Sequence, residues 1–150
     1  ESRAFAVGDG AVVLTAASDG DTDRVETILD AKTGQADRYG DDSDDMGALV
    51  GELGGGTVVN GRTMDEPDEP DPASGRLDAM VAQGRRAKVN GQTTNLKYVV
   101  VYESSDDVDT DDLEEWVTEN DAQFDDVDDV SYNSNGRLGV VTGTSDTDDL

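Results

Sequence analysis

Four aspartates near the start of the chain have the spacing of oxygen ligands in a calcium-binding loop. In an EF-hand frame, where ligands occupy positions 1, 3, 5 and 12, these positions are held by Asp19, Asp21, Asp23 and Asp30. Such a loop needs glycine at position 6, where this chain has Arg24. Aspartates also cap the start of a helix. The pattern therefore allows a metal site at these four aspartates or helix capping.

A second cluster of charged residues is basic and lies in the middle of the chain. Between Gly75 and Lys97 there are five cations and one carboxylate, in a protein of net charge -25. The cations are Arg76, Arg85, Arg86, Lys88 and Lys97. Because guanidinium and ammonium groups bind carboxylates and phosphates, they are candidates for docking a protein partner or a small anionic ligand. The alternative is neutralisation by the chain's own carboxylates from 41–45, 65–71 or 106–129.

The composition excludes several kinds of chemistry. The chain has no Cys and no His, which rules out disulfides, Cys/His zinc sites and histidine-based triads. The glycines 54–56 follow a helical pattern and precede a strand, whereas a phosphate-binding loop follows a strand and precedes a helix. Carboxylate pairs do not discriminate among 36 acidic residues. We therefore assign no catalytic residue and expect no cofactor.

The acidic residues indicate adaptation to salt. Asp outnumbers Glu by 27 to 9, and there are only 11 basic residues, a composition that resembles proteins of extreme halophiles. At about 1 M salt the Debye length is roughly 3 Å, so that surface carboxylates no longer repel one another. The negative charge argues against nucleic-acid binding. No apolar run is long enough to cross a bilayer.

Hydrophobic periodicity predicts an α+β protein. A hairpin is expected around Gly8–Gly10, and a central strand covered on both faces at 96–103, which is rich in β-branched and aromatic residues. Further strands are expected at 57–59, which would turn at Asn60–Gly61, at 127–132 and at 137–142. Helices are expected at 22–33, at 46–53 before the glycines, and from a capping Asp111 onward. An acidic, Pro-rich linker at 65–73 would precede an inserted basic helix at 74–90.

Internal repetition suggests how these elements combine. A shift of 88 residues aligns 10–41 with 98–129 without a gap and makes ten of the 32 positions identical. The repeat predicts duplicated βαβ units at about 5–64 and 95–143, within a single domain over 1–150. Two such units form a ferredoxin-like split βαβ, with helices on one face of an antiparallel sheet. The alternative is two independent βα units that both need an acidic helix start.

The C-terminal third resembles a known family. The strand Tyr98–Tyr102, a following amphipathic helix and the hairpin around Asn135–Gly136 look like the propeptide-inhibitor domains of subtilisin-type proteases, which have strand, helix and hairpin in this order. The resemblance implies a ferredoxin-like fold and a role as folding assistant or inhibitor. It covers under a third of the chain, and the first 97 residues depart from it.

These observations favour a non-enzymatic binding, sensory or regulatory domain of an extreme halophile. The ends, Glu1 and Leu150, suggest part of a longer protein, and an extracytoplasmic location is favoured over a cytoplasmic one. The alternatives are a propeptide-like inhibitor and a small enzyme of unknown chemistry. A homodimer through the sheet is also compatible with the pattern.

The charge predicts that folding depends on salt. Below about 0.5 M KCl, weaker screening should let the carboxylates repel and should abolish tertiary structure. Near-ultraviolet circular dichroism during dialysis to low salt measures this loss. An unchanged spectrum would contradict the prediction.

Overall fold

The computed structural model divides the chain into two compact units, Glu1–Asp42 and Ser43–Leu150. Each unit is described by itself. The structure describes residues 5–8, 11–14, 25, 26, 29, 30, 33–35, 43–64, 77–120 and 127–149.

The first unit contains the predicted hairpin. Strands β1 (Phe5–Gly8) and β2 (Ala11–Leu14) pair antiparallel and form a two-stranded sheet. The predicted helix at 22–33 is helical at its described residues, which are Val25, Glu26, Leu29, Asp30 and Thr33. Gly34 follows with φ 77°, a left-handed conformation that commonly ends a helix.

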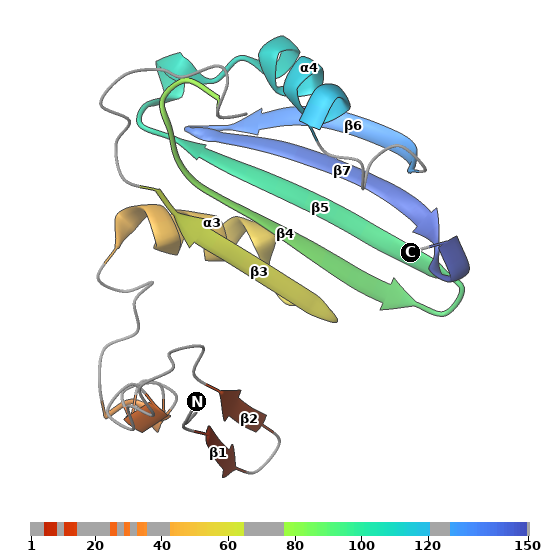
Figure 1. Ribbon diagram of the computed structural model, residues 1–150. Helices are drawn as coiled ribbons and strands as arrows, with labels where there is room; N and C mark the ends of the chain where they lie inside the picture. The colour runs from red at the N-terminus through yellow and green to blue at the C-terminus, as the bar shows by residue number, and fades with distance from the viewer. Residues whose placement is uncertain are drawn as a thin grey trace. The chain divides into compact units, whose positions relative to one another are not determined.

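The second unit is built on a five-stranded antiparallel sheet. Its order is β3-β4-β5-β7-β6, so that β5 is central and β3 and β6 are the edges (Figure 1). The strands are β3 (Val58–Thr63), β4 (Met80–Asn90), β5 (Thr93–Tyr102), β6 (Asp128–Asn135) and β7 (Leu138–Asp146). The helices are α3 (Asp44–Leu53) and α4 (Thr110–Asn120), with short 3-10 turns η2 (Ser105–Asp107) and η4 (Thr147–Asp149).

Strand β5 is buried on both faces, as the sequence predicts. Val99, Val100 and Val101 have no exposed surface, and successive side chains of a strand point to opposite faces. Val99 and Val101 belong to the cluster that contains Leu49 and Leu53 of α3. The residues between and beside them, Tyr98, Val100 and Tyr102, pack with Leu113 and Val117 of α4. One strand thus contributes to two cores.

The helices therefore lie on opposite faces of the sheet, and the prediction of helices on one face is wrong. A sheet whose central strand is apolar on both sides needs a cover on each side. The ferredoxin-like arrangement of two βαβ units is not confirmed. The half at 5–64 contributes only β3 to the five-stranded sheet, because β1 and β2 pair with each other.

Helix α3 begins and ends as its sequence predicts. The Ser43 side chain accepts a hydrogen bond from the Met46 amide, and Asp44 and Asp45 lie in the first turn, where the helix dipole favours negative charge. Gly54 ends the helix with φ 64° and donates its amide to the Val50 carbonyl. Leu49 and Leu53 are buried against the sheet.

Helix α4 has the predicted apolar stripe but a different cap. Leu113 and Val117 are buried, and Trp116 packs beside them. The Asp109 carboxylate accepts from the amides of Asp111 and Asp112, at 2.8 and 3.4 Å. The cap is therefore Asp109 and not Asp111, which lies in the first helical turn.

Two local predictions are wrong in the same region. Residues 80–90 of the predicted helix 74–90 form strand β4, which pairs with β5 from Met80 to Asn90. Strand β3 continues through Asn60–Gly61 instead of turning there. Long-range pairing overrides the local pattern, since the ladder with β5 satisfies the main chain of β4 over its whole length.

Gly61 and Gly84 are the physical reason why these strands run through glycine. They face each other across β3 and β4, on the side covered by α3. A Cβ at Gly84 would lie 2.8 Å from Leu53 Cδ1, and one at Gly61 would lie 2.8 Å from Leu49 Cδ2. The missing side chains let α3 approach the sheet.

The proposed duplication remains a prediction. Ile28, which the repeat aligns with Trp116, and the predicted linker 65–73 lie outside the described residues.

Gly84→Ala should destabilise the protein by about 1–3 kcal/mol, because the added methyl overpacks the contact between α3 and the sheet. Gly51→Ala is the matched control, since a Cβ there meets nothing within 4 Å. It should stabilise α3 by about 0.5–1 kcal/mol through helix propensity. Urea unfolding at constant salt measures both. A neutral Gly84→Ala would show that close approach is not required.

Candidate binding surface

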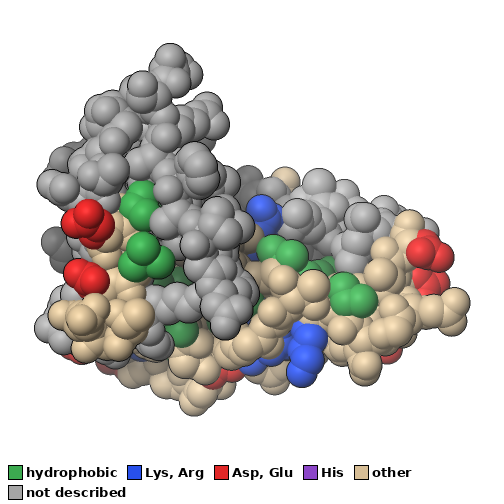
Figure 2. Space-filling view, turned by 90° about the horizontal axis from the view of Figure 1, so that it is seen from below, with side chains coloured by type: hydrophobic (Ala, Val, Ile, Leu, Met, Phe, Trp, Pro, Cys, Tyr) green, Lys and Arg blue, Asp and Glu red, His purple; other side chains and the backbone are tan. Residues whose placement is uncertain are grey.

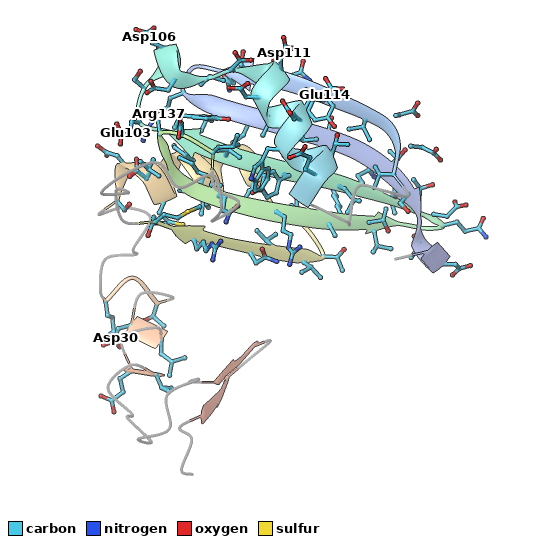
Figure 3. All side chains as sticks on the ribbon, turned by 45° about the horizontal axis from the view of Figure 1, so that its top comes forward. Asp30, Glu103, Asp106, Asp111, Glu114 and Arg137 are labelled. Carbon is cyan, nitrogen blue, oxygen red and sulfur yellow. The ribbon has the colours of Figure 1, made fainter. Side chains whose placement is uncertain are left out.

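Strands β3 and β4 carry cations and no acidic residue. Arg62, Arg85, Arg86 and Lys88 lie on these two strands, whose sequences contain neither Asp nor Glu. Seen from below, hydrophobic and basic side chains adjoin each other, and carboxylates appear mainly toward the ends of the molecule (Figure 2). On α4, by contrast, exposed Asp111 and Glu114 extend from the helix on the side away from the sheet (Figure 3).

Strand alternation divides the predicted basic cluster between two faces. Arg86 is the cross-strand partner of Lys97, whereas Arg85 is the partner of Tyr98. Lys97 contacts α3 and Tyr98 packs in the α4 cluster, so that Arg85 and Arg86 point to opposite faces. Lys88 is exposed and shares the α3 face with Arg86 by the same alternation. Arg76 lies outside the described residues.

On the α3 face, two of these cations hold the end of the helix. Lys97 Nζ lies 2.8 Å from Glu52 Oε1 and 3.0 Å from the Glu52 carbonyl oxygen. Arg86 Nη1 donates to the Leu53 carbonyl at 3.0 Å. The last turn of α3 has no basic residue of its own, and its free carbonyls form the negative end of the helix dipole. The sheet therefore supplies the cations that stabilise this end.

The carboxylate of Glu52 is half-buried in this cluster. It accepts hydrogen bonds from Lys97 and, at 3.1 Å, from Asn135 Nδ2. The hydrogen bond from Lys97 holds the pKa of Glu52 below its usual value, against the opposing effect of burial. Lys97 is thus neutralised within the chain, although Glu52 lies outside the acidic ranges that the sequence suggested for this role.

On the α4 face, a polar network connects the edge of the sheet to its aromatic core. The Gln83 amide contacts the Tyr98 hydroxyl. With its nitrogen toward that hydroxyl, its oxygen accepts from Arg62 Nη2 and Nε, at 2.5 and 2.9 Å. The Tyr98 ring stacks on Trp116 with centroids 5.5 Å apart. Arg62 is therefore oriented by a buried aromatic pair.

Arg85 lies beside this network and is exposed. It stands opposite Tyr98 on β5 and opposite Asn60 on β3, and Arg62 is two residues further along β3. These cross-strand neighbours lie on one face. We call the set Arg62, Gln83, Arg85 and Tyr98 the arginine face.

The sequence signal missed two functional cations. Arg62 is outside the basic stretch at 75–97 and joins it only because β3 pairs with β4. Arg137 Nη1 lies 2.5 Å from Asp45 Oδ1 and donates to the Tyr102 carbonyl at 3.3 Å. Arg137 thereby ties the first turn of α3 to the end of β5. No local pattern marks a contact between residues this far apart in the chain.

The predicted metal site falls mostly outside the described residues. Asp19, Asp21 and Asp23 are not described, and Asp30 is exposed. Within the part of the chain that the structure describes, no three acidic side chains are grouped so that they could hold a metal ion. Calcium binding at these aspartates stays a prediction.

One aromatic hydroxyl is buried beneath α4. Tyr102 is 2 % exposed, and its hydroxyl has no hydrogen-bond partner among the described residues. Burial, with the charges of Asp112 and Asp109, raises the pKa of Tyr102 to about 12. This hydroxyl stays protonated at neutral pH, which suits a core position and not a base.

No protein-family model, curated protein or solved structure matches this chain. Among the described helices, none combines the length and the apolar character needed to span a membrane. The functional argument therefore depends on the geometry of the arginine face, whose guanidinium groups can bind carboxylate or phosphate oxygens in pairs.

Glu52→Gln should destabilise the protein by roughly 1 kcal/mol at neutral pH, because Lys97 loses its charged partner. The lowered pKa of Glu52 means that its contribution is present above the ordinary pKa of 4.5 and is lost as the pH falls through the lower folded value. The difference between wild type and variant should therefore shrink in acid. Urea unfolding from pH 7 to pH 3 at constant salt measures it.

The control for this variant is Glu115→Gln on the exposed surface of α4. It measures the general effect of removing one negative charge. If both variants show the same stability at every pH, the Glu52 cluster does not stabilise α3.

Proposed function

We propose that the protein is a non-enzymatic binding module whose arginine face binds an anionic partner. The observation that carries this proposal is the exposure of Arg62 and Arg85 on two strands without a carboxylate, in a chain of net charge -25. Arg86 and Lys97 hold α3, whereas Arg62 and Arg85 lie on the other face of the sheet. They are therefore the better candidates for contact with a partner.

Charge complementarity supports this location. An anionic ligand is repelled by most of such an acidic surface and is attracted where cations lie without neighbouring acids. Arginine suits this role because its planar guanidinium binds carboxylates and phosphates through two parallel hydrogen bonds. The network from Trp116 to Arg62 limits the motion of one of the two guanidinium groups, and preorganisation lowers the entropic cost of binding.

The wider proposal keeps the expectations from the sequence. The protein would come from an extreme halophile, belong to a longer extracytoplasmic protein, and have arisen by duplication of a ferredoxin-like βαβ unit. In salt near 1 M, long-range attraction is screened and only contact pairs persist. An arginine face that touches its ligand directly is suited to that condition.

The second candidate is a propeptide-like inhibitor or folding assistant. The order of strand, helix and hairpin that resembles that family corresponds to β5, α4, β6 and β7. Slow, tight inhibition of a subtilisin-type protease by the purified chain would support this candidate over the binding module.

Arg85→Glu tests the proposal, with Lys88→Glu as the matched control. Both residues are exposed on β4, on opposite faces, and both changes alter the charge equally. The probe is poly-L-glutamate, titrated by calorimetry in 1 M KCl and followed by the fluorescence of Trp116, the only tryptophan. Arg85→Glu should weaken binding about tenfold or more, and Lys88→Glu should have little effect. Equal losses, or no binding by wild type, would contradict the proposal.

A further inference from the structure

Strand β3 is an exposed edge of the sheet. Among the described residues it pairs with β4 alone, and its side chains are exposed from Val58 to Arg62 (Figure 1). Val58 and Val59, on its two faces, are 56 % and 45 % exposed. Large apolar side chains beside free main-chain groups are a template for pairing with another strand.

The main-chain groups that β3 presents can be assigned from the ladder. The Met64 amide donates to the Val81 carbonyl at 2.7 Å, which directs residue 64 toward β4. In an antiparallel ladder this direction alternates from one residue to the next. Val59, Gly61 and Thr63 therefore point their amide and carbonyl groups away from β4.

The two edges of the sheet differ in their protection against such pairing. Strand β6 has Asp128 and Asp129 at its start, a register shift between Asp128 and Ser131, and a positive φ at Asp129. Inward or edge charges and bulges are the usual means of preventing edge-to-edge association. Strand β3 pairs in regular register over its whole length and has one charge, Arg62. Only the β6 edge carries these protective features.

The charge of the β3 edge selects its occupant. Arg62 lies on the edge strand itself and Arg85 on the next strand, on the same face. An added strand with carboxylates on alternate residues would place them next to Arg62, where opposite charges on neighbouring strands attract. A second copy of this chain would instead bring its own Arg62 to the same edge.

We infer that an extended, acidic polypeptide segment adds to β3 as a sixth strand of the sheet. Its main chain pairs with Val59, Gly61 and Thr63, and its carboxylates bind Arg62 and Arg85. This inference rests on the proposed function, because it specifies the partner of the arginine face and adds main-chain pairing to charge recognition. The general mode is strand addition to an exposed edge.

N-methylated peptides separate main-chain pairing from charge recognition. The probe is a fluorescein-labelled peptide of eight residues that alternates Glu and Val. Two further versions have alternate backbone nitrogens methylated, on the Glu or on the Val residues, so that one of them removes the amides facing β3 without changing charge. Anisotropy titrations in 1 M KCl should show one methylated version binding at least tenfold more weakly than the parent peptide.

Val59→Pro provides the same test on the protein. Proline removes an amide that points away from β4, so that the β3–β4 ladder is retained while strand addition is blocked. Binding should fall at least tenfold, and unchanged circular dichroism would confirm that the sheet is intact. If the variant does not fold, the peptide comparison decides alone.

The remaining outcomes distinguish this inference from the proposed function. Equal binding of all three peptides, with a loss in Arg85→Glu, would overturn strand addition and leave the anionic binding module in place. No binding of the parent peptide together with none of poly-L-glutamate would overturn both. Dimerisation of the free protein that Val59→Pro abolishes, measured by analytical ultracentrifugation, would assign the β3 edge to a second copy and overturn the inference.

Discussion

The structure of the second unit depends on the burial of one strand from both sides. Val99 and Val101 require a cover on one face of β5, and Tyr98, Val100 and Tyr102 require one on the other. Helices α3 and α4 provide these two covers. Because a strand alternates its side chains, this single constraint creates two apolar cores and divides the cations of the neighbouring β4 between two different environments.

Position on the sheet determines what each cation does. Under α3, Lys97 and Arg86 meet the negative end of the helix dipole, and Arg137 pairs with Asp45 near its start. These three residues attach both ends of a short helix to the sheet. On the other face, α4 covers the part of the sheet toward β6, and Arg62 and Arg85 are exposed on the part formed by β3 and β4. Surface charge recruited for stability and surface charge suited to binding are thus carried by adjacent residues of one strand.

The sequence predicted those elements whose pattern agrees with their final environment. The apolar run around Val99–Val101 predicts a doubly covered strand, and Leu113 with Val117 predicts the buried stripe of α4; both are confirmed. Helix α3 ends at Gly54 because its left-handed φ is a local property. The prediction failed at β4, where Met80 and Val81 fit a helical stripe equally well. Short apolar segments are ambiguous by periodicity alone, and pairing with β5 decided between the two structures.

By itself, the sequence determined the net charge of -25, the absence of Cys and His, the α+β class, and the concentration of cations between residues 75 and 97. Tertiary structure decided which of these cations meet. It brought Arg62 from a distant segment next to Arg85, and it turned Arg86 to the opposite face toward Leu53. The reason is physical: composition and local periodicity depend on the residues alone. The neighbours of a side chain across a sheet depend on strand pairing and register, and these are set by the packing of the whole unit.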